Sequence, residues 1–169
     1  RIHPATGQKR VFLGGHSMGG LLAYAYSAVH GTECVRGIVT LASPCGFQEK
    51  RAVAEDVLWL EHVLPRVSWL PLRWLARLGA PLMPLLFNTR HVRKQINVRN
   101  VRREEMGPAM WNALSNVSSS LVRQFGDWIT HDVFRSADLS VDYRESLARL
   151  DVPLLVIAGA GDVLARPAN

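Results

Sequence analysis

Three short apolar runs, each bounded by polar or turn-forming residues, divide the chain into segments. They cover residues 10–13, 35–42 and 154–158, and valine, isoleucine and leucine dominate them. Short continuous apolar runs of this kind are typical of β-strands that are covered on both faces. We therefore predict a strand at each of these three places.

An apolar pattern with helical spacing follows the first run. Its members fall along one side of a helix: Leu21, Leu22, Ala25, Ala28 and Val29. We expect this helix to run to about His30 and to end at Gly31, because glycine readily adopts the left-handed backbone of a helix C-terminus. A strand, a helix and a second strand in this order are expected to form a parallel, right-handed unit. A shorter amphipathic helix is predicted over residues 142–150, with Ser140 as its N-cap.

The long segment from Gly46 to about Leu139 has a different pattern. It contains all five tryptophans and most of the prolines. Its apolar residues recur at helical spacing at Val53, Val57, Leu60 and Leu64, and again at Met110, Leu114, Val117 and Leu121. Prolines break its middle into short pieces. We therefore predict an α/β core made of residues 1–45 and 140–169, interrupted by a mostly helical insertion over residues 46–139.

The composition indicates a folded globular domain, since 48% of the 169 residues are hydrophobic and 20% are charged. No run is both long and apolar enough for a transmembrane helix, and the N-terminal residues lack the apolar core of a signal peptide. The two cysteines, Cys34 and Cys45, show no metal-binding spacing and are too few for a disulfide framework. We expect buried, inert thiols in a cytoplasmic protein. Because the first strand follows Arg1 almost at once, we also expect the chain to be a fragment.

The formal net charge of +6 favours anionic partners. No basic region interleaved with exposed aromatic residues matches a nucleic-acid-binding module, so we expect no nucleic acid partner. Six basic residues gather between positions 90 and 103: Arg90, Arg93, Lys94, Arg99, Arg102 and Arg103. Our first interpretation is a solvated helix face paired with Glu104 and Glu105, and the alternative is attraction of an anionic substrate or a lipid surface.

The junction between the first strand and its helix carries the candidate chemistry. Gly15 and Gly19 flank Ser17 in the pattern G-x-S-x-G. A strand that reverses this sharply into a helix presses backbone against backbone, so we expect a Cβ atom at either glycine to clash. The serine is expected to adopt a strained conformation that exposes its hydroxyl. The backbone N–H of Met18 then lies at a helix N-terminus, where a negative oxygen is favoured.

This stretch, Gly-His-Ser-Met-Gly-Gly at residues 15–20, resembles the nucleophile elbow of the serine α/β-hydrolases. The resemblance implies a partial α/β-hydrolase fold: a parallel sheet of about three strands with the helical insertion as a lid. It makes Ser17 the nucleophile, gives half of the oxyanion hole to Met18 N–H, and places His16 as a packing residue or a support of the oxyanion loop. Asp162 matches the acid that follows a late strand in this family, and the alternative is an ordinary turn aspartate.

The family's catalytic histidine follows one more strand beyond the acid, and its second oxyanion donor precedes the elbow. We expect both to lie outside this chain. His91 and His131, in the predicted lid, are the alternatives for a base within it. The activity implied is hydrolysis of carboxylic esters, with a hydrophobic acyl substrate and without a cofactor or a metal. Thioesterase, amidase and acyltransferase chemistry stay open, as does a non-catalytic module that binds a hydrophobic ligand or a partner chain. Apolar residues dominate positions 57–87, which fits either an acyl-chain pocket or lipid interface, or an ordinary core.

Overall fold

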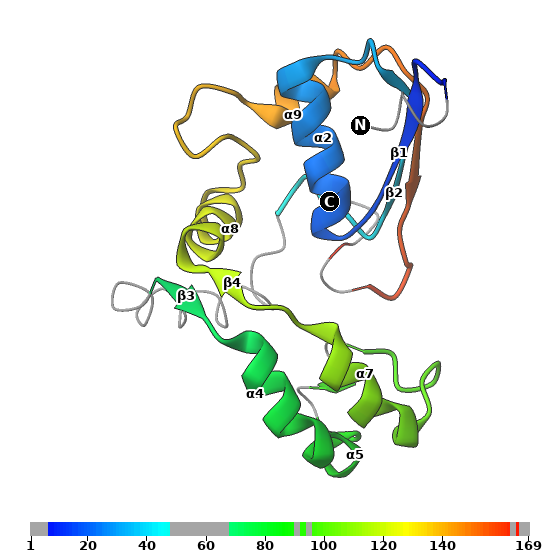
Figure 1. Cartoon of the computed structure of the whole chain (residues 1–169), viewed down its shortest axis with the longest axis vertical. Helices are drawn as coiled ribbons and strands as arrows, with labels where there is room; N and C mark the ends of the chain where they lie inside the picture. Colours follow the sequence, from blue (N-terminus) through cyan, green and yellow to red (C-terminus); the bar gives the residue numbers. More distant parts are fainter. Residues whose placement is uncertain (1–6, 48–67, 90–91, 94–95, 163–164, 166–169) are drawn as a thin grey trace. The chain divides into compact units, whose positions relative to one another are not determined.

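The chain forms two compact units in the computed structural model (Figure 1). The first combines residues 1–50 with residues 127–169, and the second covers residues 51–126. Residues 127–139, which the sequence pattern grouped with the insertion, belong to the first unit. The structure describes residues 7–47, 68–89, 92–93, 96–162 and 165. The helical spacing noted between Val53 and Leu64 lies outside these residues.

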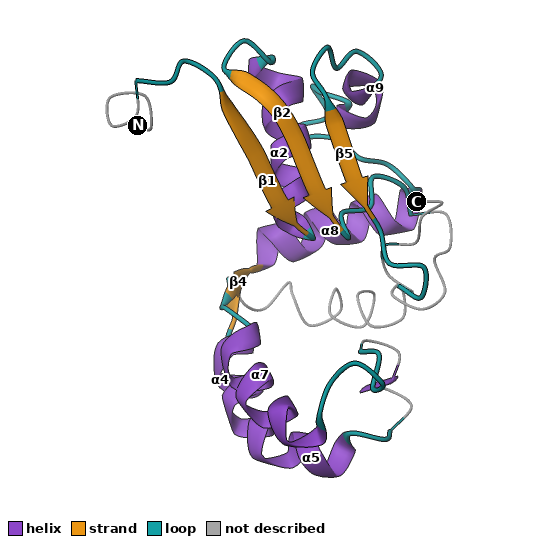
Figure 2. Cartoon of the chain, turned by 90° about the vertical axis from the view of Figure 1, so that its right-hand side faces the viewer, coloured by secondary structure: helices purple, strands orange, loops and turns teal. Residues whose placement is uncertain are grey.

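A parallel sheet of three strands is the centre of the first unit. Its strands are β1 (Val11–His16), β2 (Val35–Leu41) and β5 (Leu154–Ile157), in the order β1-β2-β5. All three predicted strands are confirmed, and so is the parallel pairing of the first two. Figure 2 shows the three strands pointing the same way, so that their carboxyl ends meet at one edge of the sheet.

One face of this sheet is covered by helices. The helix α2 (Met18–His30) packs against β1 and β2, and it also contacts α9 (Tyr143–Leu147). Figure 1 shows both helices on the same side of the sheet. In the register of the strands, Ile38 and Thr40 of β2 point to this side, and both are buried. The core of the unit therefore lies between the sheet and α2.

The opposite face of the sheet stays open in the part of the chain that the structure describes. Strand alternation and register place Phe12, Leu41, Leu155 and Ile157 on this face, and all four are exposed. The guanidinium carbon of Arg36 lies 5.9 Å from the centre of the Phe12 ring. Among the residues described, β2 is thus covered on one face, whereas all four residues of β5 are exposed, those on the α2 side included, so the prediction of strands covered on both faces is wrong for them.

Of the two helix caps predicted in this unit, the C-terminal cap of α2 is confirmed and the N-cap of α9 is wrong. Gly31 ends α2 with a positive φ of 72°, and its N–H donates to Ser27 O, as predicted. The N-cap of α9 is Asp142, whose side chain accepts from the N–H of Glu145 at 3.0 Å. Ser140 instead donates its hydroxyl to Asp138 Oδ1 at 2.7 Å. Asp142 directly precedes the first residue of α9, whereas Ser140 lies two residues further from the helix. The Asp142 carboxylate also interacts favourably with the positive end of the helix dipole.

A cluster of aromatic rings around Phe134 fixes the loop that follows α8 (Ser119–His131) to this unit. Phe134 is fully buried, and its ring centre lies 4.9 Å from that of Trp128, 5.1 Å from that of Tyr143 and 6.5 Å from that of Tyr24. All three ring pairs are edge-to-face, the arrangement that aromatic quadrupoles favour. The rings join α2, α8 and α9 around one side chain.

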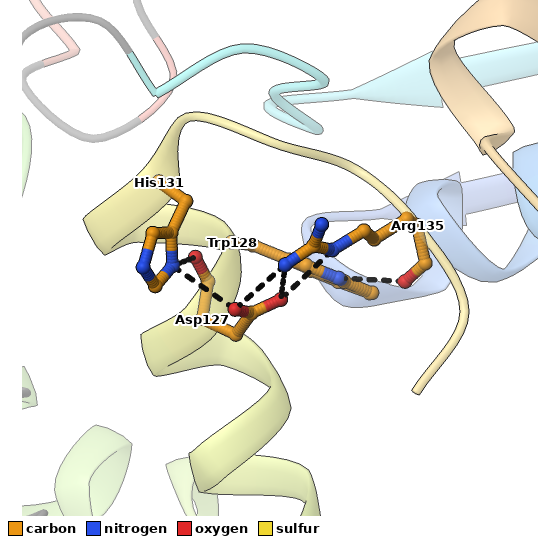
Figure 3. A network of polar contacts seen from close by, with 4 residues as sticks. All are labelled: Asp127, Trp128, His131 and Arg135. Atoms are coloured by element: carbon orange, nitrogen blue, oxygen red, sulfur yellow. Dashed lines mark hydrogen bonds and ion pairs between the residues drawn. The ribbon is translucent and has the colours of Figure 1, made fainter. Parts of the chain in front are cut away.

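A polar network beside these rings holds the same loop (Figure 3). The Asp127 carboxylate accepts from Arg135 Nη2 at 3.1 Å and 3.2 Å and from Arg135 Nε at 3.3 Å. His131 Nδ1 lies 3.0 Å from Asp127 Oδ1, and Trp128 Nε1 donates to Arg135 O at 2.8 Å. A forked guanidinium–carboxylate pair of this kind restricts the geometry of both partners. Hydrogen bonds from Arg135 to Asp127 and from Trp128 to Arg135 therefore fix the turn between α8 and Arg135.

The residues of the second unit that the structure describes form short helices and a two-stranded ribbon. Its elements in chain order are β3 (Trp69–Leu70), α4 (Leu72–Gly79), η2 (Ala80–Leu82), α5 (Met83–Leu86), η3 (Arg103–Glu105), α7 (Met106–Ala113), β4 (Val117–Ser118) and the start of α8. The strands β3 and β4 are antiparallel, and α4 packs against α7. Buried Met83, Val92 and Met106 form a small core.

Three details of this region and its surroundings differ from the sequence prediction. The helical spacing noted from Met110 to Leu121 is interrupted, because Leu114 is extended and β4 separates α7 from α8. Arg102 is paired as expected, with Glu105 Oε1 at 2.9 Å, but this pair belongs to the three-residue helix η3. In the first unit Cys34 is exposed, not buried, because it lies in the turn before β2.

Candidate active site

Ser17 lies at the sharp turn where β1 ends and α2 begins. Its backbone has φ 52° and ψ −121°, in a sparsely populated region for a residue with a side chain. Such strain costs about 1–3 kcal/mol and persists only when neighbouring contacts impose it. Here the Ser17 N–H donates to Leu41 O at 2.8 Å, and Ser17 O accepts from Gly20 N–H at 3.0 Å. Ser17 is exposed, and its hydroxyl makes no capping hydrogen bond to the helix.

Gly15 and Gly20 are the glycines that allow this turn, whereas the motif suggested Gly15 and Gly19. A Cβ atom on Gly15 would lie 2.3 Å from the carbonyl carbon of Gly19, so the expected clash is confirmed there. A Cβ atom on Gly19 would meet nothing within 4 Å, so the clash expected at Gly19 is wrong. The second tight position is Gly20, where a Cβ atom would lie 2.2 Å from Ser43 Oγ. A Cβ atom on Gly19 would point into open space, whereas one on Gly20 would point at the loop after β2.

The residues on either side of Ser17 lie at the same edge of the sheet. Met18 is the first residue of α2, so its N–H has no carbonyl of the helix before it to bind. The positive end of the helix dipole lies at the same place and favours an anionic oxygen. His16 ends β1 and is exposed; strand alternation and register place it on the open face of the sheet beside Leu41.

The loop after β2 supports the turn from the neighbouring strand. Ala42 has a positive φ of 47°, and its N–H donates to Ile157 O of β5 at 2.9 Å. Ser43 is buried, donates its hydroxyl to Leu41 O at 2.9 Å and contacts Gly20. Sequence reasoning missed this role of Ser43. The available signal was a Ser-Pro pair directly after a buried strand, which marks a loop at the sheet edge.

A buried hydrogen bond lies beneath the turn and joins the elbow helix to the sheet. Tyr24 Oη of α2 and Thr40 Oγ1 of β2 are 2.7 Å apart, and both residues are almost completely buried. Burial raises the pKa of the Tyr24 phenol, and the hydrogen bond with Thr40 lowers it in part. A neutral hydroxyl pair is therefore retained at neutral pH. It fixes how far α2 lies from the strand that precedes Ser43.

Asp162 lies in the loop after β5, at the same carboxyl edge of the sheet as Ser17. Its N–H donates to Gly159 O at 3.0 Å, and its Oδ1 accepts from Ala165 N–H at 3.0 Å. It thus orders the turn in the way a turn aspartate does. The strand order places β5 two positions from β1, about 10 Å away at the usual strand spacing.

Comparison with known proteins identifies the fold that holds this arrangement. A family model described as the alpha/beta hydrolase fold matches residues 1–169. The chain belongs to the α/β-hydrolase fold family. A deformylase from Pseudomonas putida S16 has a similar structure, with a TM-score of 0.51 at 14% identity over 99% of this chain and 55% of that one.

Two further solved structures are similar to this α/β-hydrolase chain at lower TM-scores. A hydrolase from Pseudomonas aeruginosa PA01 has a TM-score of 0.49 at 19% identity, covering 99% of this chain and 53% of that one. A monoacylglycerol lipase from Paleococcus ferrophilus has a TM-score of 0.48, with the same identity and coverages of 99% and 53%. The chain therefore spans about half the length of these structures. No curated protein matches it.

An α/β-hydrolase site of this type needs a base, and two of the sequence's histidines besides His16 are described. His30 ends α2, and its ring centre lies 4.9 Å from that of Tyr26. His131, one of the two lid histidines considered as a base, has its Nδ1 held by Asp127 on the preceding turn of α8. His91, the other, lies outside the described residues.

The described residues also bear on metals and membranes. Among them, no three His, Cys, Asp or Glu side chains come together in a group that suits a metal ion. Of the helices that the structure describes, none has the length and apolar character needed to cross a bilayer.

Proposed function

We propose that this α/β-hydrolase chain contributes the nucleophile and the acid of a serine hydrolase that cleaves carboxylic esters. The observation that carries the proposal is the backbone of Ser17: a non-glycine residue with φ 52°, exposed, at the junction of the strand β1 and a helix N-terminus. Backbone strain of this kind is typical of functional residues. The backbone clearance at Gly15 supports the same proposal, because only a glycine there allows the turn.

In the proposed reaction Ser17 Oγ attacks the carbonyl carbon of the ester while a histidine takes the hydroxyl proton. The base is a histidine outside residues 1–169, and Asp162 orients its ring. The carbonyl oxygen becomes an oxyanion beside the N–H of Met18. Collapse of this intermediate breaks the C–O bond to the alcohol, which leaves with the proton from the histidine. Water then repeats the sequence on the acyl-enzyme and releases the acid and free Ser17.

We propose a hydrophobic acyl group for the substrate and the helical unit as the lid. The support is the apolar composition of residues 57–87, in which apolar residues far outnumber charged ones. Side chains of this kind are the usual lining of pockets for apolar ligands. The reaction requires no cofactor and no metal, because the nucleophile, the acid and an oxyanion donor are all groups of the protein.

Hydrolysis of a series of p-nitrophenyl esters by the full-length protein tests the proposal. We expect the rate to rise from acetate to longer acyl chains, and we expect Ser17→Ala to lower it to the background of the buffer. Ser115→Ala is the matched control, because Ser115 is also an exposed serine but lies in the second unit, outside the elbow. Equal rates for the Ser17→Ala variant and the parent protein would show that the hydrolysis does not use this serine.

A further inference from the structure

The helices α4 and α5, with the short turn η2 between them, expose large apolar side chains in the second unit. We call these side chains the α4–α5 face: Trp74, Leu75, Leu78, Leu82, Leu85 and Leu86. Leu78 is 74% exposed and Leu85 is 71% exposed. At about 100° of helix rotation per residue, Trp74, Leu75 and Leu78 of α4 fall within about 100° of arc. They form an exposed apolar stripe along α4, and Leu82 of η2 and the two leucines of α5 follow it in the chain.

The opposite side of the same helices makes the internal contacts of the unit. Ala76, Ala80 and Met83 are buried there, and Met83 belongs to the small core with Met106. The helices α4 and α5 both pack on α7 through this side. Two small alanines and one methionine complete the packing, while the tryptophan and the leucines point outward. Exposed apolar stripes of this size mark interaction surfaces in proteins.

The charge of the unit indicates which kind of partner the stripe meets. The described part of residues 68–126 contains two acidic residues, Glu104 and Glu105, against seven arginines: Arg73, Arg77, Arg93, Arg99, Arg102, Arg103 and Arg123. Arg102 is paired with these glutamates. The remaining arginines give the unit a positive field that favours an anionic surface.

Arg77 adds a cation at the border of the stripe. Its guanidinium carbon lies 5.9 Å from the ring centre of Trp74 and 5.1 Å from that of Trp111 on α7. Its Nε is buried and has no hydrogen-bond partner among the residues described. Two indoles beside one guanidinium hold the charge next to apolar side chains, and a guanidinium group can bind phosphate through paired N–H donors.

We propose that the α4–α5 face binds the surface of an anionic lipid bilayer. The leucines and Trp74 enter the boundary between headgroups and acyl chains, and Arg77 binds a lipid phosphate at the border of the stripe. An amphipathic helix with tryptophan and leucine on one side and arginine at its border has the character of an interfacial helix. A second copy of the chain fits less well, because two such units carry charge of the same sign. This binding is independent of the chemistry proposed for Ser17.

Co-sedimentation of the full chain with lipid vesicles tests the proposal. We expect binding to vesicles of phosphatidylcholine with phosphatidylserine, weaker binding to phosphatidylcholine alone, and weakening by added salt. The double variant Leu78→Ser with Leu85→Ser is expected to lose about tenfold or more in affinity, since it removes two apolar side chains from the contact. Arg77→Gln is expected to lose about fivefold, and only on the anionic vesicles.

The matched control is Leu22→Ser. Leu22 is 65% exposed on α2 of the other unit, so the control removes an equally exposed leucine from a helix outside the α4–α5 face. We expect it to bind as the parent does. A blue shift of tryptophan emission on adding anionic vesicles, reduced in Trp74→Phe, provides a readout at the face itself. Circular dichroism of each variant confirms that its helices are retained.

Four results would overturn the proposal. These are no binding to either kind of vesicle, equal binding to both without a salt effect, unchanged binding of the double variant, and an emission shift that Trp74→Phe leaves intact. Concentration-dependent self-association that the double variant abolishes would instead assign the face to a contact between copies of the chain. Analytical ultracentrifugation without lipid measures this last outcome.

Discussion

Gly15→Ala and Gly19→Ala, at the two glycines of the G-x-S-x-G pattern, should change the free energy of unfolding in opposite directions. In Gly15→Ala the new Cβ would lie 2.3 Å from Gly19 C, 2.4 Å from Gly19 O and 2.4 Å from Gly20 N. Carbon atoms in normal contact are about 3.5–4.0 Å apart. The overlap is therefore more than about 1 Å, and it involves three atoms of the backbone.

The backbone at this turn has little freedom to move away. The Ser17 N–H is bound to Leu41 O, and Ser17 O accepts from Gly20 N–H. Extra methyl groups in tight packing usually cost about 1–3 kcal/mol and sometimes more. Since this methyl group meets backbone atoms, we expect Gly15→Ala to lower the free energy of unfolding by about 3 kcal/mol or more. For a chain of this size that corresponds to a fall in Tm of about 6–12 °C.

Gly19→Ala provides the matched comparison, because its Cβ meets nothing within 4 Å and its φ is not positive. Alanine is favoured over glycine inside a helix by about 1 kcal/mol, and Gly19 lies in the first turn of α2. We therefore expect a gain of about 0.5–1 kcal/mol. Urea unfolding of both variants, followed by circular dichroism, measures the difference. Equal shifts, or shifts of the same sign, would refute the packing described at the elbow.

Three further outcomes are expected. Tyr24→Phe should lower the free energy of unfolding by about 1–2 kcal/mol in urea titrations, since it leaves the buried Thr40 hydroxyl without its partner. The pKa of Asp138 should be about 2 by NMR titration, because the Ser136 hydroxyl, first among its donors, stabilises the carboxylate. The stability that this carboxylate provides is then present above about pH 4 and is lost as the pH falls towards about 2. Asp162→Asn in the full-length protein should lower kcat for ester hydrolysis by about 10³–10⁴ while its Tm stays close to that of the parent, since the amide oxygen can still accept from Ala165.

The parts of the fold that depend on local pattern were predictable from sequence. The strands β1, β2 and β5 are continuous apolar runs, and the end of α2 depends on a single glycine at position 31. The strained turn at Ser17 was predicted for the same reason, because glycines close to one serine between an apolar strand and a helix allow few other conformations.

The features that the sequence did not reveal depend on residues far apart in the chain. Gly20 is required because Ser43 packs on it from the loop after β2, and a motif written for one turn contains no information on that loop. The break between α7 and α8 arises where β4 pairs with β3, almost fifty positions earlier by residue number. Helical spacing on either side of a break cannot show it when the apolar residues stay in phase.

The roles of the site residues stay predictions. The structure places Ser17 and Asp162 at one edge of the sheet, and it gives Asp162 a structural role in its own turn. Catalysis by Ser17 is a chemical property, and it is measured by reactivity.

Labelling of the full-length protein with a fluorophosphonate, followed by peptide mapping, shows whether Ser17 is the nucleophile. We expect one labelled peptide that contains Ser17, and no labelling of the Ser17→Ala variant. Labelling at Ser43 or another serine, or an unlabelled protein that is folded by circular dichroism, would contradict this assignment.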